Sequence, residues 1–152
     1  MAVAVVVAAA AEAQWTWTPQ TRRWINIKHL PKETAELQIE YARSLMLKGE
    51  YKQALRETDR FQRYFADSGM ADENQFLRGE IRMAQGKLQD AAKEFQRVLT
   101  EYPETALYDD AIAKQYEIGD QYYEKGQKRL KKGWIPLRKR PLKHAMKVYS
   151  MV

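Results

Sequence analysis

The spacing of apolar residues predicts helices along most of the chain. Between residues 36 and 99, apolar side chains recur every three or four positions, as in "YARSLMLKGEYKQALRETDRF", and this period is that of an amphipathic helix. The same region contains no proline and is rich in Ala, Leu, Glu, Lys, Arg and Gln, which favour helices over strands. We therefore expect an all-α fold.

Comparison of the chain with itself indicates a repeat. Gly49 and Gly86 are 37 residues apart, and so are Ala54 and Ala91. In each unit an apolar stripe ends at the glycine, and a second stripe begins a few residues later. Because glycine readily adopts the left-handed conformation that ends a helix, each unit predicts a hairpin of two helices.

Small residues recur where the two helices of a hairpin should meet. Ala42, Gly79 and Gly119 each lie seven residues before a glycine that ends the predicted first helix. A small residue there lets the paired helix approach closely. In "YPET", Pro103 cannot continue a helix and marks the end of the second hairpin.

The third unit is interrupted. Five residues separate Gly86 from Ala91, whereas 19 separate Gly126 from Ala145, where the pattern of a second helix resumes. We therefore expect an insertion at about residues 127–140. The pattern stops within this last helix, so we expect a chain truncated at the C-terminus. The expected repeats span residues 35–68, 72–105 and 112–152.

These units resemble tetratricopeptide repeats, which are helix-turn-helix units of 34 residues. The second unit matches the family pattern at Gly79, Gly86, Ala91, Phe95, Val98 and Pro103. The resemblance implies a tetratricopeptide-like α-solenoid of antiparallel helix hairpins over residues 33–152, with about five to six helices. The third hairpin would be split by the basic insertion.

The N-terminal region has a different character. Residues 1–13, "MAVAVVVAAAAEA", form an apolar run that ends in the small-x-small pattern accepted by signal peptidase, and the run is too short to span a bilayer. An uncleaved Ala/Val-rich helix is the alternative. Residues 14–32 contain Trp15, Trp17 and Trp24, and we expect them to form a strap packed on the first hairpin. A partner-binding or carbohydrate-stacking strip is the alternative for these tryptophans.

A narrower resemblance is to the tetratricopeptide lipoproteins of outer-membrane assembly, the BamD-type family. Tyr102, Pro103, Thr105 and Ala111 fit the motif that joins hairpins in those proteins. The resemblance implies an exported scaffold in the periplasm or cell envelope, associated with the outer membrane, with outer-membrane assembly components as candidate partners. The chain has no cysteine, so a lipid anchor is not supported. A cytoplasmic adaptor is the alternative.

The resemblance also places a peptide-binding groove on the first helices of successive hairpins, which line the concave face of such solenoids. Two apolar rows with methionines suit a variable apolar peptide, and the charged row between them is of mixed sign. Packing between hairpins is the alternative role for these side chains. The expected groove residues are Ile39, Arg43, Met46, Phe76, Glu80, Met83, Tyr116, Asp120 and Tyr123.

The net charge of +6 has a local origin. Ten Lys and Arg and no Asp or Glu lie between Lys125 and Lys147, whereas residues 1–124 carry 16 basic and 20 acidic residues. The insertion is either a solvated extension or a contact for anionic lipid headgroups, and an acidic partner protein is a further alternative. Nucleic acid is disfavoured because a single Trp interleaves the charges. The candidate anionic-surface residues are Lys128, Arg129, Lys131, Lys132, Trp134, Arg138, Lys139 and Arg140.

No pattern supports catalysis. His29 and His144 lie in different segments, and the chain contains neither a glycine-rich phosphate loop nor a Cys/His cluster. We expect no enzyme activity, no cofactor and no bound metal.

Overall fold

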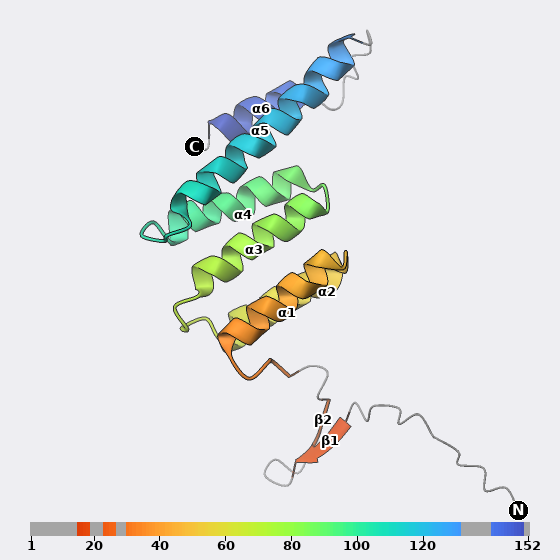
Figure 1. Ribbon diagram of the computed structural model, residues 1–152, viewed down its shortest axis with the longest axis vertical. Helices are drawn as coiled ribbons and strands as arrows, with labels where there is room; N and C mark the ends of the chain where they lie inside the picture. Colours follow the sequence, from red (N-terminus) through yellow and green to blue (C-terminus); the bar gives the residue numbers. More distant parts are fainter. Residues whose placement is uncertain (1–14, 19–22, 27–29, 132–140, 151–152) are drawn as a thin grey trace, which may run out of the picture. The chain divides into compact units, whose positions relative to one another are not determined.

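The computed structural model describes residues 15–18, 23–26, 30–131 and 141–150. The chain divides into two compact units, Met1–Pro31 and Lys32–Val152. Figure 1 shows the helices of the second unit and the strands of the first.

The N-terminal unit contains a two-stranded antiparallel sheet. Strands β1 (Trp15–Thr18) and β2 (Arg23–Asn26) pair so that Trp17 lies opposite Trp24. Threonine and tryptophan favour strands, but the sequence analysis predicted no strand here. Packing of this segment on the first hairpin stays a prediction, and the signal-like residues 1–13 lie outside the described residues.

Six helices make up the described part of the second unit, and they form three antiparallel hairpins (Figure 1). The all-α solenoid predicted from the sequence is confirmed for this unit. The third hairpin is split as predicted, because residues 132–140 separate its two helices. Its first helix nevertheless continues through Gly126 to Lys131, so Gly126 does not end that helix as the repeat spacing predicted. The helices are α1 (Ala35–Leu47), α2 (Tyr51–Tyr64), α3 (Ala71–Ala84), α4 (Leu88–Glu101), α5 (Tyr108–Lys131) and α6 (Pro141–Tyr149).

The first two hairpins turn in the same way. Gly49 and Gly86 have φ of +78° and +72°, the left-handed conformation that glycine adopts without strain. The amide of Gly49 donates to Met46 O at 2.9 Å, and the amide of Gly86 donates to Met83 O at 2.8 Å. The two glycines therefore end α1 and α3 with the same hydrogen-bonded turn.

Small residues mark the points where the two helices of a hairpin approach each other closely. A Cβ at Gly79 would lie 2.6 Å from the ring of Phe95, so α3 and α4 meet where only glycine fits. Gly119 lies in the same way beneath the ring of Tyr149. The third hairpin thus repeats the packing of the second, although its two helices are separated by the insertion.

The core runs through the unit as two adjoining clusters. The first lies among α1, α2 and α3 and includes Phe61 and Leu77, both fully buried. The second lies among α3, α4, α5 and α6 and includes Phe95 and Ile118, also fully buried. Each hairpin therefore completes its apolar core against the next hairpin, as expected for a repeat that cannot fold alone.

Candidate functional site

The first helices of the hairpins carry a row of charged side chains, which we call the first-helix surface. It is the side of α1, α3 and α5 that bears Arg43, Glu73, Glu80, Glu117 and Asp120. Arg43 crosses from α1 to α3, with Nη2 at 3.2 Å from Glu73 Oε1 and Nη1 at 3.5 Å from Glu80 Oε2. These ion pairs link the first two hairpins along the surface.

Glu80 is the least solvated of the charged groups in this row. Its side chain is 26% exposed, and Oε2 accepts no hydrogen bond from the described residues. Burial raises the pKa of the Glu80 carboxyl above its ordinary value, and the positive charge of Arg43 partly offsets this rise. Glu80 therefore joins the surface at an electrostatic cost to the fold at neutral pH.

The predicted apolar row is wrong for two of its three members. Ile39 is 2% exposed and Phe76 is 9% exposed, and both belong to the core clusters. The physical reason is that the next hairpin covers them: Ile39 clusters with Leu77 of α3, and Phe76 with Ile118 of α5. The side chains of Ile39 and Phe76 are therefore not available to line a groove.

The other predicted groove residues lie nearer to the solvent. Met46 and Met83 are half-buried against the core clusters. Tyr116 and Tyr123 of α5 are 49% and 50% exposed. Among the predicted groove residues, the exposed apolar side chains therefore lie on α5, instead of forming two continuous rows.

Tyr149 joins this region from α6, a contact that the sequence analysis did not predict. Its hydroxyl donates to Asp120 Oδ1 at 2.7 Å, and its ring centroid lies 6.1 Å from that of Tyr116. The hydrogen bond to the carboxylate raises the pKa of Tyr149 to about 12. The equivalence of Tyr149 with Phe95 over the two helical glycines could have located this contact from the sequence.

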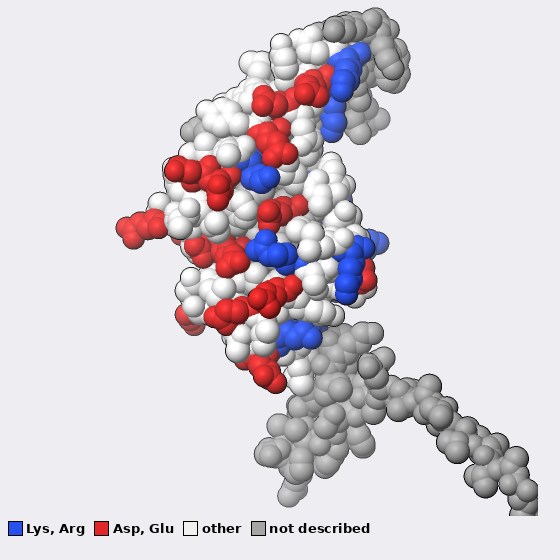
Figure 2. Space-filling model, viewed as in Figure 1, with Lys and Arg blue, Asp and Glu red and all other residues white. Residues whose placement is uncertain are grey.

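Charge is divided between the two kinds of helix. The first helices, with α5 taken as far as Glu124, carry ten Asp and Glu against four Lys and Arg. The second helices carry five acidic and eight basic residues. Figure 2 shows the acidic side chains spread over one face of the unit with fewer basic ones between them. The first helices are therefore net negative up to Glu124, whereas the last turns of α5, from Lys125 to Lys131, carry four Lys and Arg and no acidic residue.

The predicted anionic-surface contact falls mostly outside the described side chains. Lys128 is exposed, and its Nζ lies 3.7 Å from Glu124 Oε2. The side chains of Arg129 and Lys131, and the residues Lys132, Trp134, Arg138, Lys139 and Arg140, lie outside the described part. This contact stays a prediction.

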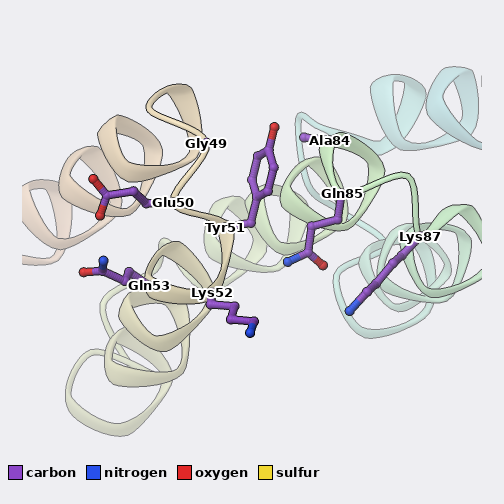
Figure 3. A pocket seen from close by; sticks show the side chains of 8 residues that line it. All are labelled: Gly49, Glu50, Tyr51, Lys52, Gln53, Ala84, Gln85 and Lys87. Atoms are coloured by element: carbon purple, nitrogen blue, oxygen red, sulfur yellow. The ribbon is translucent and has the colours of Figure 1, made fainter.

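A hollow of about 520 Å³ lies between the turns of the first two hairpins. Figure 3 shows Tyr51 and Gln85 between the two turns, with Lys52 extending from the first hairpin and Lys87 from the second. It is separate from the first-helix surface, and the sequence analysis did not predict it. The remaining lining residues are Gly49, Glu50, Gln53 and Ala84.

The described residues offer no cluster typical of a metal centre. Among them, no group of three or more His, Asp and Glu side chains could hold a metal ion. His144 Nδ1 lies 2.5 Å from Gln89 Nε2 and its ring stacks near Tyr122, whereas His29 is outside the described residues. None of the described helices combines the length and apolar character needed to cross a bilayer.

Comparison with curated proteins and with solved structures gave no significant match. A family model described as "Tetratricopeptide repeat" matches residues 73–105. This stretch contains nearly all of α3, the turn at Gly86 and the whole of α4. The helical unit is therefore a tetratricopeptide-like solenoid, and its second hairpin is the part that is similar to the family model.

Proposed function

We propose that the chain is a non-enzymatic scaffold that binds a segment of another protein along the first-helix surface. The observation that carries the proposal is the row of equivalent positions Arg43, Glu80 and Asp120. These positions recur on the first helix of each hairpin, and Arg43 bridges α1 to α3. A row of this kind can contact one partner segment at several repeats in succession.

The side chains beside this row suit contact with a peptide. Met46 and Met83 are half-buried and flexible, while Tyr116 and Tyr123 expose about half of their surface. Methionine adapts to different shapes, and tyrosine supplies contact area with little loss of side-chain entropy. Tetratricopeptide repeats typically act as non-enzymatic scaffolds for protein or peptide partners, and this supports the same function.

The test is selection of binding peptides from a display library, followed by amide chemical-shift mapping on the whole chain. We expect selected peptides to shift resonances of α1, α3 and α5 more than those of α2, α4 and α6. An Arg43→Ala variant should weaken binding because Arg43 is half-exposed and joins two helices of the surface. Arg56→Ala, at an exposed position of α2, is the matched control.

Two results would contradict this function. One is the absence of any peptide that binds more tightly than an unselected pool. The other is a set of shifts centred on the second helices and unaffected by Arg43→Ala. In the second case the protein still binds a partner, but through a different face.

The signal-like run at residues 1–13 supports a further proposal, that the scaffold is exported and acts in envelope or outer-membrane protein assembly. A second feature supports the same proposal, because the motif at Tyr102–Thr105 between the second and third hairpins is similar to the segments that join hairpins in BamD-type proteins. The test is mass spectrometry of the N-terminus in cells. Removal of the run supports export, and survival of residue 1 or 2 supports a cytoplasmic adaptor instead.

A further inference from the structure

Three tyrosines lie on the same side of the α5–α6 hairpin as Asp120, and we call Tyr116, Tyr123, Tyr149 and Asp120 the tyrosine cluster. Tyr116, Asp120 and Tyr123 share one side of α5, because they are spaced four and three residues apart. Tyr149 of α6 packs over Gly119 and donates its hydroxyl to Asp120 Oδ1 at 2.7 Å. Its ring centroid is 6.1 Å from that of Tyr116.

Asp120 differs from the equivalent residues of the first two hairpins in its charge balance. Arg43 and Glu80 lie in one ion pair at 3.5 Å. Asp120 forms no salt bridge with a described Lys or Arg, since the nearby Lys114 and Lys128 pair with Glu117 and Glu124. Among the described side chains, the one that bonds to the Asp120 carboxylate is the Tyr149 hydroxyl, so a cation from outside could be attracted to Asp120.

The rings around Asp120 suit the same kind of ligand. Tyr116 and Tyr123 are 49% and 50% exposed, so about half of each residue is accessible to a binding partner. The face of a phenol ring is electron-rich and attracts ammonium and guanidinium groups. Tyr149 is neutral at physiological pH, as tyrosine ordinarily is, and its hydrogen bond to Asp120 raises its pKa further, to about 12. It therefore fixes the Asp120 carboxylate without adding charge.

We propose that the tyrosine cluster binds a Lys or Arg side chain of the partner segment, with Asp120 as the counter-charge and the exposed rings as its walls. The proposal rests on the proposed function insofar as it names the partner's chemistry. A neutral apolar side chain would cover the rings but remove the Asp120 carboxylate from water without compensation, which is unfavourable. An acidic side chain would face the negative charge of the Asp120 carboxylate itself.

The test uses two matched pairs of small probes with the full chain. N-acetyl-arginine amide is compared with its neutral citrulline counterpart, and N-acetyl-lysine amide with the norleucine counterpart. Tyrosine ring resonances are followed in a chain labelled at tyrosine. We expect the cationic member of at least one pair to shift Tyr116, Tyr123 and Tyr149 with an affinity roughly fivefold or more above its neutral partner.

Variants connect the effect to this cluster. Asp120→Asn and Tyr123→Leu change exposed side chains, so the fold should persist, and each should weaken cation binding by roughly fivefold. Glu104→Gln, an exposed carboxyl in the connection before α5, is the matched control and should leave binding unchanged. Increasing salt should weaken binding of the cation in the unaltered chain.

Equal shifts from charged and neutral probes would overturn the proposal, and so would binding unaffected by Asp120→Asn or no shift at these tyrosines. Shifts that depend on protein concentration alone would assign the cluster to a second copy of the chain and overturn it as well. Cation binding here without any peptide ligand in the display test would leave this proposal standing and remove the proposed function. If the selected peptides bind equally well to the Asp120→Asn variant, the proposed function stands and the cation-binding proposal is overturned.

Discussion

The second and third hairpins share one plan but differ in how their second helix is held. In the second hairpin Phe95 packs on Gly79 and is fully buried. In the third hairpin Tyr149 packs on Gly119, remains partly exposed and reaches Asp120 with its hydroxyl. The aromatic contact of the second hairpin is therefore apolar and shielded from water, whereas the equivalent contact of the third hairpin ends in a hydroxyl group at the surface.

A buried hydrogen bond shows the same difference. Gln75 Nε2 donates to Glu94 O at 3.1 Å and to Glu94 Oε2 at 2.7 Å. Gln38 and Glu57 form the same pair in the first hairpin, at 3.1 and 2.8 Å. Each pair ties the first helix of its hairpin to the second helix.

In the third hairpin this pair is broken because Val148 replaces the glutamate. Gln115 instead donates backward to α4, to Gln96 Oε1 at 3.0 Å and to Ala92 O at 3.4 Å. The polar contact therefore ties α5 to the second hairpin, and α6 is held by polar contacts of partly exposed side chains instead, Tyr149 with Asp120 and His144 with Gln89. We infer that α6 is held less strongly than α2 or α4, so that it should open at a lower free energy than they do.

The largest expected effect comes from truncating the two aromatic rings. Phe95→Ala should lower the free energy of unfolding by about 3–5 kcal/mol, because a fully buried ring leaves a cavity. Tyr149→Ala should cost about 1–2 kcal/mol, since its ring is only partly buried at the end of α6. Urea denaturation followed by circular dichroism measures both. Equal losses would contradict the difference between the hairpins.

The helical fold could be predicted from the sequence because its determinants are local. Gly49 and Gly86 end helices through their own backbone conformation, and Gly79 and Gly119 mark close helix contacts at fixed spacing. The insertion followed from one change in that spacing. The β1–β2 pair was missed because two strands of four residues are too short to show a period.

The candidate site was less predictable because exposure depends on packing between hairpins. The repeat spacing placed Ile39 on the same helix side as Arg43, but α3 covers Ile39 and leaves Arg43 half-exposed. The repeat spacing predicted Asp120 as a groove residue. Its contact with Tyr149 was not predicted, because the two residues lie on opposite sides of the insertion in the sequence. A contact of this kind follows only when the two halves of the third hairpin are aligned with the second.

A smaller effect is expected from the buried glutamines. Gln75→Leu should cost about 1–3 kcal/mol, because it removes both hydrogen bonds and leaves the mostly buried Glu94 carboxylate with poorer solvation. Gln115→Leu should cost less than about 1 kcal/mol, since Gln115 Oε1 has no partner among the described residues and its removal relieves a penalty. Thermal and urea unfolding of the two variants provides the measurement.

Gln38→Leu is the matched control for this pair of variants. It removes the equivalent hydrogen bonds to Glu57 in the first hairpin, together with one that the Lys32 amide donates to Gln38 Oε1 at 2.9 Å, so it should cost at least as much as Gln75→Leu. If Gln115→Leu were as destabilising as the other two, the backward contact to α4 would be as strong as the pairs inside the first two hairpins. The proposed weakness of α6 would then need another cause.

The smallest expected effect is a pH dependence of the free energy of unfolding. It arises at one repeat position, which holds the half-buried Glu80 in the second hairpin and the exposed Asp120 in the third. Burial raises the pKa of Glu80 above its ordinary value of 4.5, so its charged form is less favourable in the folded state than in the unfolded chain. Its contribution to stability is therefore fully present below the unfolded pKa and is lost as pH rises through the folded pKa. Glu80→Gln stays neutral throughout, so the variant should gain stability relative to the unaltered chain as pH rises.

Urea unfolding of both proteins between about pH 3.5 and about pH 7 measures this difference. The two curves should converge at the acidic end, where Glu80 is protonated in both the folded and unfolded states. In an Arg43→Gln background the gap at neutral pH should widen, because the charge that partly offsets the burial of Glu80 is gone. A gap that is constant with pH would mean that Glu80 is solvated as well in the folded chain as in the unfolded one. The contrast between a half-buried acid in the second hairpin and an open one in the third would then have no electrostatic consequence.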